Sequence, residues 1–198
     1  MKNYLIYFVI FSFISITYFQ YSNINQEDNY KENIRKERNE KFNYLKNSKD
    51  SPFYGKKFEG LKYFDPEISF KTIAKIEYLE KKDSIPLKGS SDDKIIYLKF
   101  ARASMMLKGK RINLILYKKP KNKNEIFLLF NDETNGNETY SGGRYIDLNF
   151  KNAKRVEIDF NKAYNPYCEY DIKYNCPIPP EENKLPLKIL AGEKKYFN

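Results

Sequence analysis

The chain has 198 residues, of which 41% are hydrophobic and 17% aromatic. This length fits one domain with an accessory segment, and the hydrophobic content excludes global disorder. Because the sequence contains no His, His-dependent catalytic triads, imidazole general bases and His-ligated zinc are excluded. The net charge of +10 comes from Lys and Arg residues that are mixed with acids along the chain. A nucleic-acid partner is therefore not expected, since such partners need clustered basic residues.

The N-terminal segment has the composition of an export signal. Lys2 precedes an apolar and aromatic run over residues 4–19, interrupted only by Ser and Thr. This run is slightly short for a full membrane span, and it is followed by no small-residue cleavage site. We expect residues 1–22 to be a signal peptide or an uncleaved signal anchor, and both alternatives stay open. The protein would then be anchored in the inner membrane facing the periplasm, or secreted to the periplasm.

Residues 23–50 are strongly charged and carry few apolar positions. Tyr30, Ile34 and Leu45 fall roughly on one helical face, and Glu37 lies four residues before Lys41. This pattern predicts an amphipathic helix that also serves as a spacer. Asp50, Ser51 and Pro52 then break it.

From residue 70 onward the hydrophobic pattern changes to period two, which is typical of half-buried strands. Strands are predicted at residues 70–78, 96–100, 105–107, 112–117, 126–130, 144–150, 155–160 and 185–190, with a hairpin turn at 108–110. The segment 126–130 is apolar on both faces and is expected to be central. We therefore predict a mostly β domain over residues 51–198, an antiparallel β-sandwich or small barrel of about eight strands.

Residues 131–145 form a polar connection with three acids, several amides and three glycines. Carboxylates and carbonyls in such a loop can surround calcium. The spacing does not fit an EF-hand loop, so a polar connection with glycines at its turns is favoured over a metal site.

Arg144 has an unexpected position in the strand pattern. It shares the parity of Ile146 and Leu148, which belong to the core-facing row. An Arg in such a row is usually paired with a carboxylate or lies at the rim. We predict a pair with Asp159 or Asp147, which would be a structural salt bridge or a ligand clamp.

A long proline-rich excursion over residues 163–185 contains the two cysteines, Cys168 and Cys176. Long ordered loops in compact domains are often functional. In an oxidising envelope the two cysteines would close a disulfide. A two-cysteine metal site lacks His, and a catalytic Cys would lack a His partner, so both are disfavoured.

Several unusual strings occur in order in the last third of the chain. They are TYSGGRYID at 139–147, DFNKAYNPYC at 159–168, CPIPP at 176–180 and AGE at 191–193. Together with the opening at 51–64, they closely resemble the bacterial domain-of-unknown-function 1684 family, from about residue 30 to the end. The resemblance implies a site in this polar last third, and it brings no activity with it. The positions it marks are Asp132, Thr134, Gly136, Thr139, Tyr140, Arg144, Asp147, Asp159, Asn161, Tyr164, Asn165, Cys168, Cys176 and Asn183.

These observations leave three functional hypotheses. The first is a module that binds a small ligand, a carbohydrate or an anion, or another envelope component. Its aromatic faces would come from Tyr140, Tyr145, Tyr164, Tyr167 and Tyr170, and its polar floor from Arg144, Asp159 and Asn161. The second is a hydrolase with paired carboxylates, and the third is a structural scaffold without a small-molecule site. Whether the protein is an enzyme is left undecided, and no cofactor is expected. The ligand-binding candidates are Asp132, Thr134, Tyr140, Arg144, Asp147, Asp159, Asn161, Tyr164, Asn165 and Asn183.

Overall fold

The computed structural model describes residues 2–81, 83–91, 93–119 and 125–197, including all their side chains except those of residues 2–6, 9 and 23. By its internal contacts the chain divides into residues 1–40 and residues 41–198. The second part is called the β unit below, and each part is considered by itself.

The N-terminal segment is one helix, α1 (Lys2–Asn47), rather than two separate elements. Residues 2–47 contain neither Gly nor Pro, so nothing in the sequence interrupts the helical hydrogen bonds. Among the side chains that the structure describes, no helix has a stretch long and apolar enough to cross a membrane. Part of the predicted signal segment, the side chains of residues 1–6 and 9, lies outside the described residues. The predicted signal or anchor therefore stays a prediction.

The predicted break after α1 is confirmed and has a clear cause. The hydroxyl of Ser51 donates to the carbonyl of Leu45 at 2.5 Å, and it accepts the amide hydrogen of Phe53 at 3.0 Å. The last turn of the helix is thus capped by the chain that leaves it.

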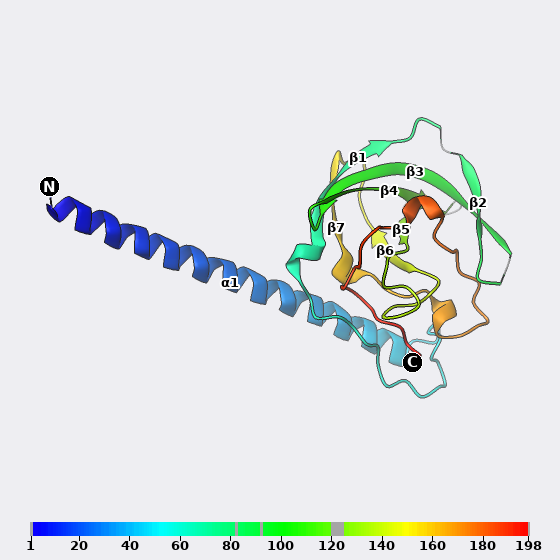
Figure 1. Ribbon diagram of the computed structural model, residues 1–198. Coiled ribbons are helices and arrows are strands. Elements are labelled where there is room, and N and C mark those ends of the chain that lie inside the picture. The colour runs from blue at the N-terminus through cyan, green and yellow to red at the C-terminus, as the bar shows by residue number, and fades with distance from the viewer. Residues whose placement is uncertain (1, 82, 92, 120–124, 198) are drawn as a thin grey trace. The chain divides into compact units, whose positions relative to one another are not determined.

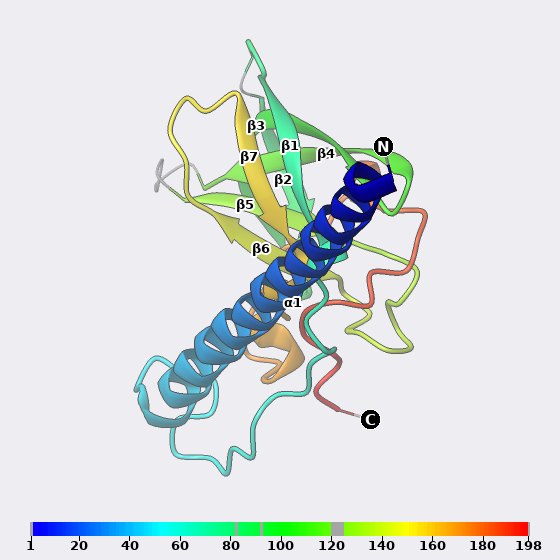
Figure 2. The same cartoon turned by 90° about the vertical axis from the view of Figure 1, so that its left-hand side faces the viewer.

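The β unit contains one seven-stranded antiparallel sheet, which curls into a half-barrel (Figures 1 and 2). Its order is β6-β5-β4-β3-β1-β7, and β2 pairs with β3 beside this path. The strands are β1 (Lys71–Tyr78), β2 (Ser84–Lys88), β3 (Lys94–Leu107), β4 (Lys110–Lys118), β5 (Ile126–Phe130), β6 (Arg144–Leu148) and β7 (Arg155–Asp159).

The mostly β, antiparallel prediction is confirmed, but the arrangement differs from a sandwich or closed barrel of eight strands. The predicted strands at 96–100 and 105–107 are both part of the long β3. The segment 185–190 is not a regular strand, and β2 was not predicted. The sheet stays open because β6 and β7, at the ends of the strand order, do not pair with each other.

The predicted hairpin turn joins β3 to β4 at Lys108 and Gly109. Both residues have positive φ, 48° and 75°, as a type I′ turn requires. Leu107 and Lys110 are paired directly across it.

One face of the sheet carries the main core. Side chains from the sheet strands pack there against the chain that follows η4 (Glu181–Asn183), and Figure 1 shows this C-terminal segment inside the curl. Leu185, Leu187, Ile189 and Ala191 are buried in this core. Burying each of the larger side chains stabilises the fold by about 1.5–3 kcal/mol relative to exposure.

A bulge in β3 builds the second face. The register against β4 shifts between Lys99 and Ala101, so that Phe100 is an extra residue and the strand changes parity there. Ala101 and Ala103 face the main core, whereas Tyr97, before the bulge, belongs to a second cluster on the opposite face.

Candidate functional site

The second cluster provides an aromatic surface on the face of the sheet opposite the main core. Leu87, Tyr97, Ile115, Tyr117, Leu129 and Tyr145 form it, with Phe127 and Tyr164 packed at its edge. Successive strand residues alternate between the faces, so β5, apolar at every position, supplies Leu128 to the main core and Leu129 to this cluster. β5 is an interior strand, since it is paired with β4 on one side and with β6 on the other, but it lies second from the edge of the sheet and not at its centre.

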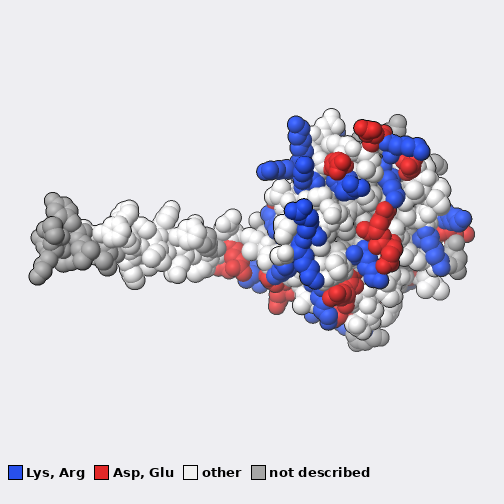
Figure 3. Space-filling model, turned by 45° about the horizontal axis from the view of Figure 1, so that its top comes forward, with Lys and Arg blue, Asp and Glu red and all other residues white. Residues whose placement is uncertain are grey.

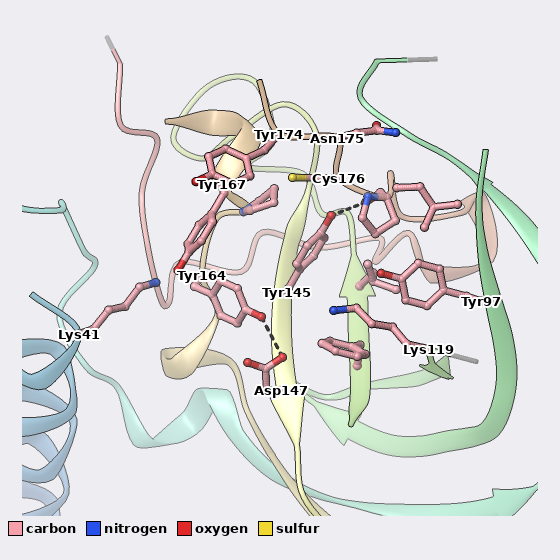
Figure 4. Close-up of a pocket in the computed structure, with 15 residues that line it drawn as sticks. Lys41, Tyr97, Lys119, Tyr145, Asp147, Tyr164, Tyr167, Tyr174, Asn175 and Cys176 are labelled. Atoms are coloured by element: carbon pink, nitrogen blue, oxygen red, sulfur yellow. Dashed lines mark hydrogen bonds between the residues drawn. The ribbon is translucent and has the colours of Figure 1, made fainter. Parts of the chain in front are cut away.

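A cleft of about 600 Å³ opens on this surface. Its size lies within the range of small-molecule sites. The aromatic residues that line it are Tyr97, Phe127, Tyr145, Tyr164, Tyr167 and Tyr174. Figure 4 shows the five tyrosine rings arranged around the opening, with Asp147 below Tyr164. The remaining lining residues are Lys41, Ile95, Lys119, Leu129, Pro166, Asn175, Cys176 and Pro177, along with Asp147.

The polar groups of the cleft are already oriented. The Tyr164 hydroxyl donates to Oδ1 of Asp147 at 2.8 Å (Figure 4). The Tyr145 hydroxyl donates to the carbonyl of Pro177. Lys41 Nζ lies 4.7 Å from the centre of the Tyr164 ring and 3.0 Å from Oε2 of Glu193. Its charge is therefore balanced by a buried carboxylate while its ammonium group borders the cleft.

The protonation states follow from burial. Desolvation raises the pKa of the Asp147 carboxyl, Glu125 acts in the same direction, and the hydrogen bond from Tyr164 opposes both. Desolvation also raises the pKa of Tyr97 to about 12 and that of Tyr164 well above its ordinary value. At neutral pH Tyr97 and Tyr164 are therefore uncharged, and the cleft offers their neutral rings and hydroxyls beside the Asp147 carboxyl group.

A smaller cavity of about 280 Å³ adjoins the cleft and shares Tyr145, Pro166, Cys176 and Pro177 with it. Tyr140 and Cys168 line its other side. The predicted disulfide is not present, because Cys168 and Cys176 are both free thiols. The Cys168 amide instead donates to Cys176 Sγ at 3.2 Å, which makes the two cysteines hydrogen-bonded neighbours.

On the face shown in Figure 3, Lys and Arg side chains of the β unit lie among Asp and Glu side chains. The described residues also form ion pairs, such as Lys71 with Glu157 and Lys188 with Glu138. This face therefore carries no extended basic surface of the kind that binds nucleic acid.

Comparison with known proteins gives a family and no activity. A model of proteins of unknown function, DUF1684, matches residues 56–194. The chain belongs to the DUF1684 family. The matched DUF1684 range includes the described lining of the cleft except Lys41. None of the curated proteins compared matches the chain.

The DUF1684 chain is also similar to a solved structure, the solution NMR structure of an uncharacterized protein of Haloarcula marismortui. The two are 30% identical, with a TM-score of 0.66 over 86% of this chain and 96% of that chain. The family resemblance seen in the sequence is thus confirmed, and the fold of the β unit is shared with a protein of unknown function.

Only three of the ten predicted ligand-binding residues line the two cavities. Asp147 and Tyr164 line the cleft, and Tyr140 lines the smaller cavity. The others lie in hydrogen-bonded networks within the protein.

Arg144 is the centre of one such network, and its predicted partners were wrong. Its Nη2 donates to Oδ2 of Asp132 at 2.8 Å, and both side chains are fully buried. It also donates to the carbonyls of Ile189, Ala191 and Glu193. Asp159 and Asp147 are elsewhere because Arg144 points into the main core, where the C-terminal segment lies.

The loop that supplies Asp132 is held by its own side chains. Asp132 Oδ1 accepts from the amide and the hydroxyl of Thr134, at 2.9 and 2.6 Å, and from the amide of Ile189 at 3.2 Å. Among the described residues, no group of three or more His, Cys, Asp or Glu is arranged to hold a metal ion. The hydrogen bonds of Asp132 fit the interpretation of residues 131–145 as a polar connection.

Asp159 and Asn161 connect β7 to the chain before β1. Asp159 Oδ1 accepts from the amide and the side chain of Asn161, both at 3.0 Å. The Asn161 side chain in turn binds the backbone amide and carbonyl of Glu67, at 2.9 and 2.8 Å.

The two remaining candidates are buried asparagines. Asn165 Nδ2 donates to Glu193 Oε1 at 2.9 Å and to the carbonyl of Lys194 at 2.8 Å. Asn183 is bonded to the backbones of β4 and β5.

The sequence did indicate some of the aromatic residues and the buried face on which the cleft lies. Tyr145 and Tyr167 were expected as aromatic faces, and the two-sided apolar pattern of β5 indicated a second buried face. Tyr97 was missed because the bulge reverses parity within β3. Lys41 and Tyr174 come from segments whose paths the local pattern does not determine.

Proposed function

We propose that the protein is a small-ligand-binding module whose ligand is a carbohydrate that lies in the aromatic cleft. The observation that carries this proposal is the lining itself, six aromatic rings around one carboxyl group. Sugar rings present apolar faces that stack on aromatic side chains and hydroxyl edges that need hydrogen-bond acceptors. Asp147 lines the cleft and is exposed along part of its surface, so its carboxyl group offers such an acceptor.

The charges favour a neutral ligand over a small anion. Lys41 is paired with Glu193 at 3.0 Å, and Lys119 lies 3.7 Å from a carboxylate oxygen of Glu125. With both cations of the lining facing carboxylates, the cleft has no surplus positive charge to hold an anion.

Thermal unfolding of the full chain with neutral mono- and disaccharides, and separately with phosphate and sulfate, tests the proposal. A saccharide at 100 times its Kd should stabilise the protein by about 2.7 kcal/mol, a shift of a few degrees in Tm. Asp147→Asn removes the charged acceptor and should weaken binding about tenfold or more, as expected for a hydrogen bond to a charged group. Tyr174→Ala should weaken it by removing one stacking face.

Glu157→Gln is the matched control, because Glu157 is an exposed carboxylate on β7 outside the cleft lining. It should leave the saccharide shift unchanged. A shift from phosphate or sulfate alone, lost in Lys41→Gln, would replace the carbohydrate with an anion. No shift from any compound in the panel would contradict the cleft as a site for these ligand classes.

We also propose that the module acts in the cell envelope, with the N-terminal segment as its membrane attachment. Support comes from the apolar run at residues 4–19 and from the exposed aromatic side chains of α1, among them Phe11 and Phe13 at 70% and 68% exposure. Aromatic and aliphatic side chains at such exposure are typical of surfaces that meet lipid or protein.

A further inference from the structure

The two cysteines form a pair at the smaller cavity, eight positions apart in the chain. Cys168 lies in η3 (Tyr167–Glu169), a single turn that follows Pro166. Both side chains are half-buried, and both line the 280 Å³ cavity together with Tyr140 and Ser90. A small molecule that enters this cavity therefore meets two sulfur atoms.

The hydrogen bonds around the pair distinguish the two sulfurs. The Cys168 amide donates to Cys176 Sγ at 3.2 Å, and the Cys176 amide donates to Ser90 Oγ at 3.1 Å. The Tyr140 hydroxyl lies 3.7 Å from Cys168 Sγ. Cys168 Sγ is thus the sulfur beside the Tyr140 hydroxyl, whereas Cys176 Sγ accepts from a backbone amide.

This arrangement gives the two thiols different pKa values. The hydrogen bond from Cys176, with further ones from Tyr140 and Ser90, lowers the pKa of Cys168 to about 6. The same contact with Cys168, followed by burial, raises the pKa of Cys176. The titratable groups around Cys168 also include Glu169, next to it in the chain, which acts on Tyr140 through its charge. The cavity therefore brings together one thiol of lowered pKa and one of raised pKa.

We propose that Cys168 is a nucleophilic site for thiol–disulfide exchange with low-molecular-weight disulfides that enter the smaller cavity. The Cys168 thiolate attacks one sulfur of the disulfide, a new sulfur–sulfur bond forms to Cys168, and the old bond breaks. The second half of the small molecule leaves as a thiolate, so charge and sulfur–sulfur bonds balance. The attacking form is the thiolate, and the site is open, as exchange requires.

The rate advantage can be estimated at pH 6. Half of a thiol of pKa about 6 is ionised there, against about 0.3% of an ordinary thiol of pKa about 8.5, a ratio of about 150. A less basic thiolate is also a weaker nucleophile, by about 20-fold for this pKa difference. Cys168 should therefore react about tenfold faster than an ordinary thiol at pH 6.

The test is the pH–rate profile of the full chain with the chromogenic disulfide dithiobis-nitrobenzoate, followed by the released thiolate. One fast thiol is expected, with a rate that levels off above pH about 7, whereas an ordinary thiol keeps gaining rate to about pH 9. Cys168→Ser should remove the fast phase. Cys176→Ala should keep one reactive thiol but move the inflection of its pH–rate profile to higher pH. Tyr140→Phe should move this inflection in the same direction by a smaller amount.

Two results would overturn the proposal. One is a fast phase that survives in Cys168→Ser. The other is a Cys168 that titrates like an ordinary thiol, or reacts only after the protein is unfolded in denaturant. Circular dichroism of each variant shows whether it is folded, so a loss of reactivity in a folded Cys168→Ser protein is not confused with misfolding.

Discussion

At the scale of single residues, the most unusual feature is a permanent positive charge inside the main core. Arg144 is fully buried, and its charge is neutralised by Asp132 at 2.8 Å. Three backbone carbonyls of the C-terminal segment take its other hydrogen bonds. The pair therefore attaches the loop of residues 131–143 and the C-terminal segment to the start of β6.

We expect Asp132→Asn to lower the free energy of unfolding by about 3–5 kcal/mol, because it leaves Arg144 as a buried charge without a counter-ion. Urea unfolding followed by circular dichroism measures the change. The exposed Glu157→Gln, on β7, should change stability by less than about 0.5 kcal/mol. A loss below about 1 kcal/mol in Asp132→Asn would mean that the backbone carbonyls and the nearby Glu193 carboxylate suffice to stabilise the Arg144 charge.

For single residues, the sequence pattern predicted burial better than it predicted contact partners. The parity of Arg144 with Ile146 and Leu148 predicted its core-facing position, and this is confirmed. Its partner was not predictable, since Asp132 reaches it through a loop held by contacts to Ile189, far along the chain. Similarly, the polar last third contained the cleft residues Asp147 and Tyr164, but its composition did not separate them from buried asparagines.

At the scale of elements, Asn183 acts as a substitute for strand pairing. The ladder between β4 and β5 joins Tyr117 to Phe127 and Lys118 to Ile126. Two positions further along this register, at Ile115 and Leu129, the Asn183 side chain bonds to both strands. Its Oδ1 accepts from the Ile115 amide at 2.7 Å, and its Nδ2 donates to the carbonyls of Ile115 and Leu129 at 2.8 and 2.7 Å.

Asn183→Ala should destabilise the fold by about 3 kcal/mol or more, because three buried backbone groups lose their partners. Hydrogen exchange provides a local measurement, in which the Ile115 amide should lose most of its protection. The exposed Asn113→Ala, also on β4, is the control and should leave this amide protected. Unchanged exchange at Ile115 in Asn183→Ala would show that the strands close over the gap by themselves.

Element prediction succeeded where the hydrophobic alternation is regular and failed where a single residue interrupts it. Phe70, Ala74 and Ile76 are buried on one face as their spacing predicts. In β3, the bulge buries Tyr97 and exposes Ile96, the reverse of the local expectation. β2 contains Pro86, and its pairing to β3 alone fits the edge positions that Pro tolerates.

The prediction of a strand at residues 185–190 failed for a different reason. Leu185, Leu187 and Ile189 are buried in alternation, as in a strand. Its backbone, however, bonds partly to side chains, with the Ile189 amide on Asp132 and the Ile189 carbonyl on Arg144. The alternation thus predicted the burial correctly but not the partner of the backbone.

At the scale of the whole molecule, the apolar run at residues 4–19 of α1 and the net charge of +10 offer two different routes to a membrane. Contact through apolar side chains survives high salt, whereas attraction of a basic protein to anionic lipid is screened at an ionic strength of about 1 M. We expect the full chain to float with neutral phosphatidylcholine vesicles in a density gradient, and to remain bound in about 1 M salt. A chain of residues 41–198 should stay at the bottom. Flotation only with anionic vesicles, reversed by salt, would assign the attachment to charge instead of to α1.

The buried pair of Arg144 and Asp132 couples the evolution of two positions that are 12 residues apart. A lineage that loses one member first passes through an intermediate with an unpaired buried group, so neutral drift at either position alone is blocked. Position 144 is the more restricted, since an apolar replacement would also leave the carbonyls of Ile189 and Ala191 without a donor. Among descendants of this sequence, changes at 132 should therefore be rare, should occur together with changes at 144, and should be accompanied by rebuilding of the C-terminal segment.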